Sequence, residues 1–252
     1  MNSMVHVCYR HLISVLYCVI KQTSSGVSII ITSTRVAIVL TLSGILFGIS
    51  AVNAAPQSIM VLNAQGQPAQ NMVVYLLPSA PANIVTTVAP SKAEVHQKDK
   101  QFSPYITVVQ KGNDVAFVNE DDITHHIFSA LGPKRFSFKL RHQQQQQILR
   151  FEQTGHVSMG CNVHDWMSGH LLVVDTPFYA VTNLQGIVTF EHLPADDFKL
   201  VVWHPQLKMP DNQQVKPVHF PSDNTMTITL QADFDSIPSQ QSLDEFEFLE
   251  GY

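Results

Sequence analysis

The chain has 252 residues, of which 45% are hydrophobic and 14% charged, so it can form a substantial core and is not a disordered polar chain. Residues 1–54 contain three basic residues and no acidic one, and the remainder therefore contains 12 bases and 20 acids, a formal charge of −8. An acidic body of this kind lacks the phosphate-neutralising surface of a nucleic-acid-binding protein, and we predict no nucleic-acid partner.

Residues 1–54 are predicted to be a leader. Arg35 precedes an uncharged apolar run, Val36–Ser50, and small residues then provide a Val-x-Ala cleavage site that ends at Ala54. The run is shorter than the about 20 residues that a membrane span requires. We therefore expect a secretory signal peptide, a periplasmic mature protein and no membrane contact after cleavage. The alternative is an uncleaved N-terminal anchor, because further apolar segments lie upstream of Arg35.

The rest of the chain shows short β-branched and aromatic runs separated by Gly, Pro and Asn, and almost no helical periodicity. The first two runs, within Ser58–Pro78, predict a hairpin with its turn at Gln65–Pro68, because Gly and Pro supply the dihedral angles of a chain reversal. The polar stretch Asn83–Gln101 has no strand signal of its own and is predicted to be a linker.

A second hairpin follows the linker. In it, Lys111–Asp114 turns the predicted strand Ile106–Val109 back into the strand Val115–Val118. Beyond this hairpin, an acidic loop leads to two adjacent histidines, His125 and His126.

The second half of the chain continues the strand pattern. The tract Gln143–Gln147 is expected to be a solvated loop tip, and the acidic tail 233–252 to be a frayed terminus, with a docking peptide as the alternative. Apolar runs predict strands at 155–161, 169–175, 187–193, 198–204 and 224–232. The chain is therefore predicted to be all-β, with two sandwiches.

The segment Gly160–Gly169 (GCNVHDWMSG) lies between two predicted strands and carries the residues of greatest chemical interest. Cys161, His164 and Met167 offer a thiolate, an imidazole and a thioether within seven residues. Cys161 is the sole cysteine after the leader, which excludes a disulfide in the mature protein and any site with two thiolates. Alternation along residues 155–161 directs its side chain inward with the core.

Together with a histidine of the upstream pair, this loop provides one Cys, two His and one Met, the ligand set of a type 1 copper site. Zinc is disfavoured because a thioether is not among its usual ligands. Neighbouring residues in an extended segment point to opposite faces, so only one of His125 and His126 reaches the metal unless the strand bulges. The alternative without a metal is a buried thiol, a surface histidine and a core methionine.

Two motifs resemble those of a known family. CNVHDWMSG resembles the C-x-x-H-x-x-M loop of amicyanin-type cupredoxins, and VQKGNDVAFVNEDDITHH resembles the cupredoxin run of strand, Gly turn, strand, Asn, acidic loop and ligand histidine. The resemblance covers about residues 102–175 and implies a cupredoxin Greek-key β-sandwich that holds one copper ion. Counted from Asn119, it implies four metal ligands: His125, Cys161, His164 and Met167. His126, the alternative ligand, stands where the family commonly has Asn and is expected to hydrogen-bond across to the Cys161 loop.

The flanking segments resemble a different fold. Ser58–Pro78 and Phe178–Pro205 are similar to the carboxypeptidase-regulatory-like sandwich, in which a turn Gly and a strand precede Leu-Pro, a short turn and an aromatic residue that opens another strand. The resemblance implies that a cupredoxin domain, residues 83–176, is inserted in a second small β-sandwich formed by residues 55–82 and 177–232. Exported bacterial proteins of this composite type are often labelled methylamine utilization proteins, which suggests a redox setting but no substrate.

The cupredoxin resemblance implies a blue-copper protein that carries single electrons between periplasmic redox proteins. Four protein ligands leave no open position for a substrate, so we expect no enzyme activity, and we expect a monomer. The alternatives are a copper-delivery protein and an interaction module without metal. Five basic residues between 134 and 150 form either a docking surface for an acidic redox partner or a solvated loop. Trp166 is expected either to form an apolar collar around the copper or to pack as core, and His170 to be an ordinary histidine rather than a further ligand.

Overall fold

The computed structural model describes residues 6–10, 16–20, 55–79, 93–142, 146–222 and 225–240. The chain separates into two units, Met1–Val52 and Asn53–Tyr252. In the first unit, strands β1 (His6–Arg10) and β2 (Leu16–Ile20) pair antiparallel. The predicted apolar leader run and its cleavage site lie outside the described residues. Among the residues that are described, no helix has the length and apolar character needed to cross a membrane.

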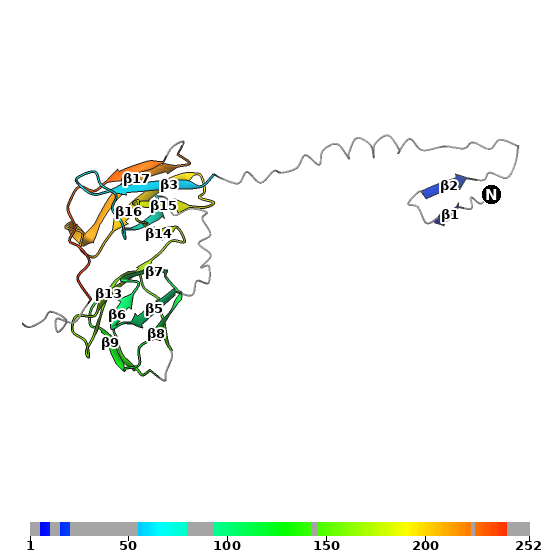
Figure 1. Ribbon diagram of the computed structural model, residues 1–252. Coiled ribbons are helices and arrows are strands. Elements are labelled where there is room, and N and C mark those ends of the chain that lie inside the picture. The colour runs from blue at the N-terminus through cyan, green and yellow to red at the C-terminus, as the bar shows by residue number, and fades with distance from the viewer. Residues whose placement is uncertain are drawn as a thin grey trace, which may run out of the picture. The chain divides into compact units, whose positions relative to one another are not determined.

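The second unit consists almost entirely of strands, which confirms the predicted all-β class (Figure 1). Its first sandwich has a five-stranded sheet in the order β10-β9-β12-β13-β7 and a four-stranded sheet in the order β11-β8-β5-β6. The strands are β5 (Ala93–Lys98), β6 (Gln101–Ser103), β7 (Ile106–Gln110), β8 (Asp114–Asn119), β9 (His125–Ser129), β10 (Phe136–Leu140), β11 (Gln146–Arg150), β12 (Gly155–Cys161) and β13 (Ser168–Val174). Neighbouring strands are antiparallel except for β7 with β13 and β5 with β8, which are parallel.

Apolar side chains from both sheets fill the first sandwich. Phe117 of β8, Ile127 of β9 and Val157 of β12 belong to one buried cluster and have no exposed surface. Buried and more exposed residues alternate along β9 and most of β12, as expected for strands with one face on a core. The same cluster contains Cys161 and Met167, so this core extends to the predicted ligand loop.

The second sandwich is assembled from segments on both sides of the first. Its two sheets have the orders β14-β4-β16-β17 and β15-β3-β18, and β18 is parallel to β3. Its elements are β3 (Gln57–Leu62), β4 (Val73–Pro78), β14 (Tyr179–Val181), β15 (Ile187–Phe190), β16 (Asp196–Trp203), the 3-10 helix η1 (Pro210–Asn212), β17 (Gln213–Phe220) and β18 (Met226–Thr229). Buried residues of both sheets, among them Val61, Leu76 and Leu200, form its core.

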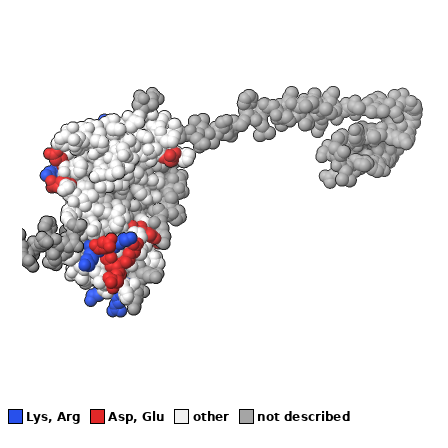
Figure 2. Space-filling model, viewed as in Figure 1, with Lys and Arg blue, Asp and Glu red and all other residues white. Residues whose placement is uncertain are grey.

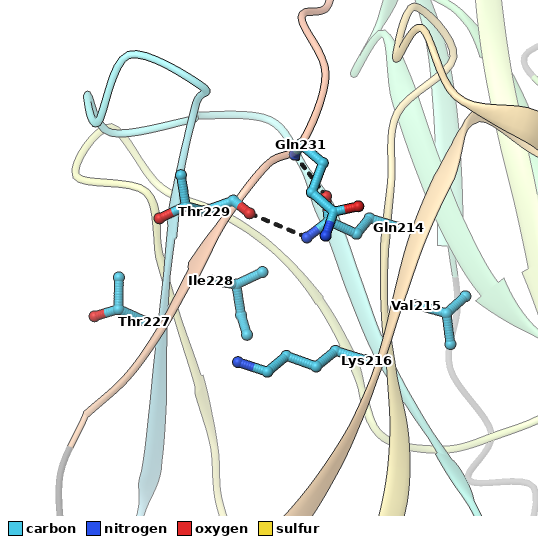
Figure 3. Close-up of a pocket in the computed structure, with 7 residues that line it drawn as sticks. All are labelled: Gln214, Val215, Lys216, Thr227, Ile228, Thr229 and Gln231. Carbon is cyan, nitrogen blue, oxygen red and sulfur yellow. Dashed lines mark hydrogen bonds between the residues drawn. The ribbon is translucent and has the colours of Figure 1, made fainter.

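One side chain links the two sheets of the second sandwich at the edge where β17 and β18 lie (Figure 3). Gln214 donates from Nε2 to the carbonyl of Thr229 at 3.0 Å, and its Oε1 accepts from the N–H of Gln231 at 2.8 Å. Lys216 and Ile228 line the groove beside this contact. At this edge, the side chain of Gln214 therefore connects the two sheets, rather than backbone pairing between β17 and β18.

The two sandwiches share a third cluster of buried side chains. Ile106 and Leu172 of the first sandwich and Val73 and Trp203 of the second belong to it. Ile237, from the segment after β18, packs against the same cluster. The interface is therefore apolar at its centre, which favours a fixed contact between the sandwiches.

Histidines and a tyrosine form a buried polar network at this interface. The Tyr105 hydroxyl lies 2.9 Å from Nε2 of His170, and Nδ1 of His170 lies 2.8 Å from Nε2 of His156. Gln206 donates from Nε2 to the Tyr105 hydroxyl at 2.9 Å and from its backbone N–H to Nδ1 of His204 at 3.2 Å. Burial lowers the pKa values of His170 and His204 to about 4. These histidines are consequently neutral near pH 7.

Two predicted loops contain strands. The expected linker Asn83–Gln101 includes β5, whose sequence is polar because only Val95 and Gln97 are buried. The expected glutamine loop tip runs into β11, where Gln146 and Gln147 pair with β8. The linker expectation is wrong, and the loop-tip expectation is wrong for Gln146 and Gln147, while residues 143–145 lie outside the described residues. Both strands carry little of the apolar alternation that identifies strands in a sequence.

Residues 233–240 of the predicted acidic tail are also more ordered than a frayed terminus, and the rest of that tail, 241–252, lies outside the described residues. Phe234 packs against the core of the second sandwich. Further along, the buried side chain of Gln240 accepts a hydrogen bond from the N–H of Phe102 at 3.0 Å and donates to the Phe102 carbonyl at 3.4 Å. Residues 234–240 therefore run from the second sandwich back to β6 of the first.

Candidate metal centre

Strand pairing and one short loop bring three of the predicted ligands together. His125 begins β9 and Cys161 ends β12, and the antiparallel pairing of these strands sets Cys161 opposite Ile127. His125 and Ile127 are two residues apart, so their side chains share the buried face of β9. His164 and Met167 lie in the following loop, which is tightened by a hydrogen bond from the Met167 N–H to the His164 carbonyl at 3.1 Å.

Two imidazoles face one sulfur atom in the core. Nδ1 of His125 and Nδ1 of His164 lie 3.8 and 3.9 Å from Sγ of Cys161. The side chains are buried, and one ligand atom from each lies within 4.8 Å of the others. A trigonal metal ion with bonds of about 2.0 Å to nitrogen and about 2.3 Å to sulfur separates these atoms by about 3.7 Å. The three residues therefore fit a single metal ion.

Met167 is the fourth residue of the predicted set. It is 1% exposed and belongs to the same buried cluster as Cys161. A thioether is a soft donor that suits copper, whereas zinc is usually bound by thiolate, imidazole and carboxylate. The composition of the site therefore fits copper better than zinc.

The surroundings of Cys161 favour its thiolate. Burial raises the pKa of Cys161, but hydrogen bonds from His125 and from backbone N–H groups outweigh it, so the pKa lies below its ordinary value. One of these groups is the N–H of Val163, 3.4 Å from Sγ. Burial, followed by the positive charges of His125 and Lys100, lowers the pKa of His164. A thiolate and a neutral imidazole are the forms that bind metals.

An aspartate contacts the other nitrogen of His125. Oδ2 of Asp121 lies 2.8 Å from Nε2 of His125, and the Asp121 side chain is 11% exposed. The loop is shaped by Asn119, whose Oδ1 accepts from the Asp121 N–H while its Nδ2 donates to the carbonyls of Ile123 and Leu140. Burial lowers the pKa of His125, but the contacts with Cys161 and Asp121 outweigh it and raise the pKa overall. The sequence motif did not single out Asp121, although a carboxylate shortly before a ligand histidine is a signal for such a contact.

Comparisons with known proteins give only partial structural likeness. No protein-family model matches the chain, and a search of curated proteins finds no match either. A copper-containing nitrite reductase from Thermus scotoductus SA-01 is 23% identical with a TM-score of 0.32, and the match covers 45% of this chain and 28% of that one. A purple cupredoxin from Nitrosopumilus maritimus is 22% identical with a TM-score of 0.29, over 32% of this chain and 99% of that one. A mutant amicyanin in its reduced state is 18% identical with a TM-score of 0.31, over 40% of this chain and 99% of that one.

His126 points away from the cluster around Cys161. It contacts Asn162, the first residue of the loop that follows Cys161. Its Nε2 lies 2.8 Å from the Ser137 hydroxyl, and its Nδ1 lies 3.3 Å from Nδ2 of Asn162. The His126 carbonyl accepts from the Asn162 N–H at 2.9 Å. The structure therefore places His126 as a link between β9, β10 and the residue after Cys161.

The other residues of interest lie at different distances from the cluster. The Trp166 ring is 5.2 Å from the His164 ring, centre to centre, and its Nε1 is buried with no hydrogen-bond partner among the described residues. His170 belongs to the network between the sandwiches rather than to this cluster. Of the five basic residues between 134 and 150, Lys139 lies on β10 and Arg150 on β11, the edge strands of the two sheets, and the other three lie outside the strands.

Proposed function

We propose that the protein is a type 1 copper protein that transfers single electrons. One observation carries the proposal: two imidazole Nδ1 atoms face the buried Sγ of Cys161 at 3.8 and 3.9 Å in a core that also holds Met167. Four protein ligands leave no position for a substrate, which favours a carrier over an enzyme. Copper bound here supplies a one-electron couple between Cu(II) and Cu(I).

In this function, the fold holds the proposed metal ligands in a fixed geometry. His125 and Cys161 lie on paired strands with a packed core behind them, so their separation changes little when the charge at the site changes. The backbone N–H groups around Sγ and the apolar residues of the core set the stability of the thiolate. His164 is 8% exposed, whereas His125 has no exposed surface, so His164 provides the shorter route for an electron to the surface.

We also propose where the protein acts and with what kind of partner. The apolar run that follows Arg35 supports export to the periplasm, where the electron donor and acceptor are redox proteins and this protein acts as a monomer. The second sandwich is assigned to the carboxypeptidase-regulatory-like type on its Leu-Pro and aromatic pattern, and a methylamine utilization setting rests on that composite alone.

The test is to load purified protein with Cu(II) and record its visible spectrum. We expect an intense band at roughly 600 nm from sulfur-to-copper charge transfer, and we expect it to be absent from Cys161→Ser. A strong band that persists in Cys161→Ser contradicts the assignment. A copper-delivery role is separated by two further measurements, since a carrier shows a reversible voltammetric wave and slow loss of Cu(I) to a chelator. Rapid transfer to the chelator without a stable wave supports delivery instead.

A further inference from the structure

The carboxylate of Asp121 joins three groups that come from separate parts of the first sandwich. Oδ2 lies 2.8 Å from Nε2 of His125 on β9. The same carboxylate accepts the backbone N–H groups of Asp99 at 2.7 Å and Lys100 at 3.0 Å, in the turn between β5 and β6. Both turn residues have left-handed backbone conformations, with φ of 54° and 56°, which aim consecutive N–H groups at the carboxylate. Asp121 is therefore held in place independently of His125.

The contact fixes which nitrogen of His125 is free for a metal. With Nε2–H donated to Asp121, loss of the Nδ1 proton that lies toward Cys161 leaves the lone pair of the neutral imidazole on Nδ1, the atom that faces Sγ. A carboxylate on the far side of a ligand imidazole also makes the ligand more basic. A more basic ligand and a nearby negative charge both favour the more highly charged metal ion.

We propose that Asp121 is a positioning residue that orients His125 and lowers the reduction potential of the site by favouring Cu(II) over Cu(I). The inference rests on the proposed copper function and extends it to a residue outside the ligand set. It also connects the potential to the β5–β6 turn, because the N–H groups of Asp99 and Lys100 hold the carboxylate where it meets His125.

Long-range charge must be separated from this contact. Acidic and basic side chains gather on the face of the first sandwich over β5 and β8, where Glu120 pairs with Lys98 (Figure 2). Asp122 is exposed and adjacent to Asp121, and its removal changes the net charge by the same amount. Asp122→Asn is therefore the matched control for Asp121→Asn.

The experiment compares wild type, Asp121→Asn, Asp121→Glu and Asp122→Asn after copper loading. We expect Asp121→Asn to lose about 10- to 100-fold in Cu(II) affinity and less in Cu(I) affinity. A tenfold difference between the two losses raises the potential by about 59 mV. Asp121→Glu, which keeps the charge, should recover most of the wild-type potential, and Asp122→Asn should stay close to it. A potential in Asp121→Asn no higher than that of Asp122→Asn overturns the proposal.

A measurement on the wild type keeps the proposal testable if Asp121→Asn does not fold. In the diamagnetic Cu(I) form, the Nε2 proton of His125 should be visible by NMR and exchange slowly, because it is buried and bonded to Asp121. Exchange as fast as that of the His164 ring proton overturns the proposal. Failure of the copper function itself is recognised separately, by a wild type that shows no blue band.

Discussion

Two adjacent histidines on β9 have unrelated environments because consecutive side chains of a strand point to opposite faces. His125 has no exposed surface and faces Sγ of Cys161. His126 is partly exposed and contacts Ser137 and Asn162. One residue is placed to bind a metal, and the other ties the loop after Cys161 to the neighbouring strands.

The two histidines therefore give opposite expectations on substitution. His125→Ala removes a proposed ligand, so the expected blue band of the copper-loaded protein should be lost or replaced by that of an altered site. His126→Asn leaves the cluster intact and should change the band little, with at most a modest shift in potential. Absorption spectra and voltammetry of both variants check this. Loss of the band in His126→Asn, with retention in His125→Ala, contradicts the assignment.

Sequence reasoning reached these residues because the chemistry of the ligand loop is local. Cys161, His164 and Met167 lie within seven residues, and their types alone indicate a soft metal. The contact of Asp121 with His125, four residues on, had a local signal that was not used, whereas its hydrogen bond from the N–H of Asp99 depends on the parallel pairing of β5 with β8. A contact created by pairing between distant segments leaves no local signature in the chain.

At the level of whole elements, strands with long apolar runs were predicted, whereas several others were not, including β9 and β10, although β10 alternates apolar and polar residues. β12 and β13 carry valine, leucine and methionine on buried positions and were expected within a residue or two of their bounds. The edge strand β11 and the polar β5 were not expected. The order of the strands in each sheet could not be predicted from the apolar pattern of the sequence, since it depends on which surfaces pack together.

The segment after β18 offers a test at this scale. Gln240 supplies an acceptor and a donor to the backbone of Phe102 in β6, an edge strand. Gln240→Ala leaves those buried groups without a partner and should lower the free energy of unfolding by about 1–3 kcal/mol. Urea unfolding measures the loss, and Ser239→Ala, at an exposed neighbouring position, is the control. Equal stability of the two variants contradicts the inferred role of Gln240.

For the molecule as a whole, the interface histidines make stability depend on pH. The pKa of His170 and the pKa of His204 are each lowered from 6.5 to about 4 by burial. Between these values the unfolded chain binds protons that the folded chain does not, so stability is complete above about pH 6.5 and falls as the pH drops toward 4. Each histidine lowers the free energy of unfolding by about 2 kcal/mol at pH 5 relative to pH 8.

Unfolding measured from pH 8 to pH 4 checks this expectation. His204→Asn retains an acceptor for the N–H of Gln206 but does not titrate, so its stability should fall less steeply with pH than that of the wild type. If the stabilities of His204→Asn and the wild type fall equally with pH, His204 does not contribute to the pH dependence. The copper site is not needed for this measurement, which can be made on the metal-free protein.

The insertion of one sandwich within the other has a consequence for the order of assembly. β4 and β14 are paired neighbours, with Tyr75 opposite Tyr179, although the whole first sandwich lies between them in the chain. Closing so long a loop in an unfolded chain is entropically costly, and such non-local pairing is slow. Once residues 93–174 have folded as a continuous stretch, the effective loop is short. We therefore expect the first sandwich, which contains Cys161, to fold first. The second sandwich, whose strands come from both sides of the first, should complete its sheets only afterwards.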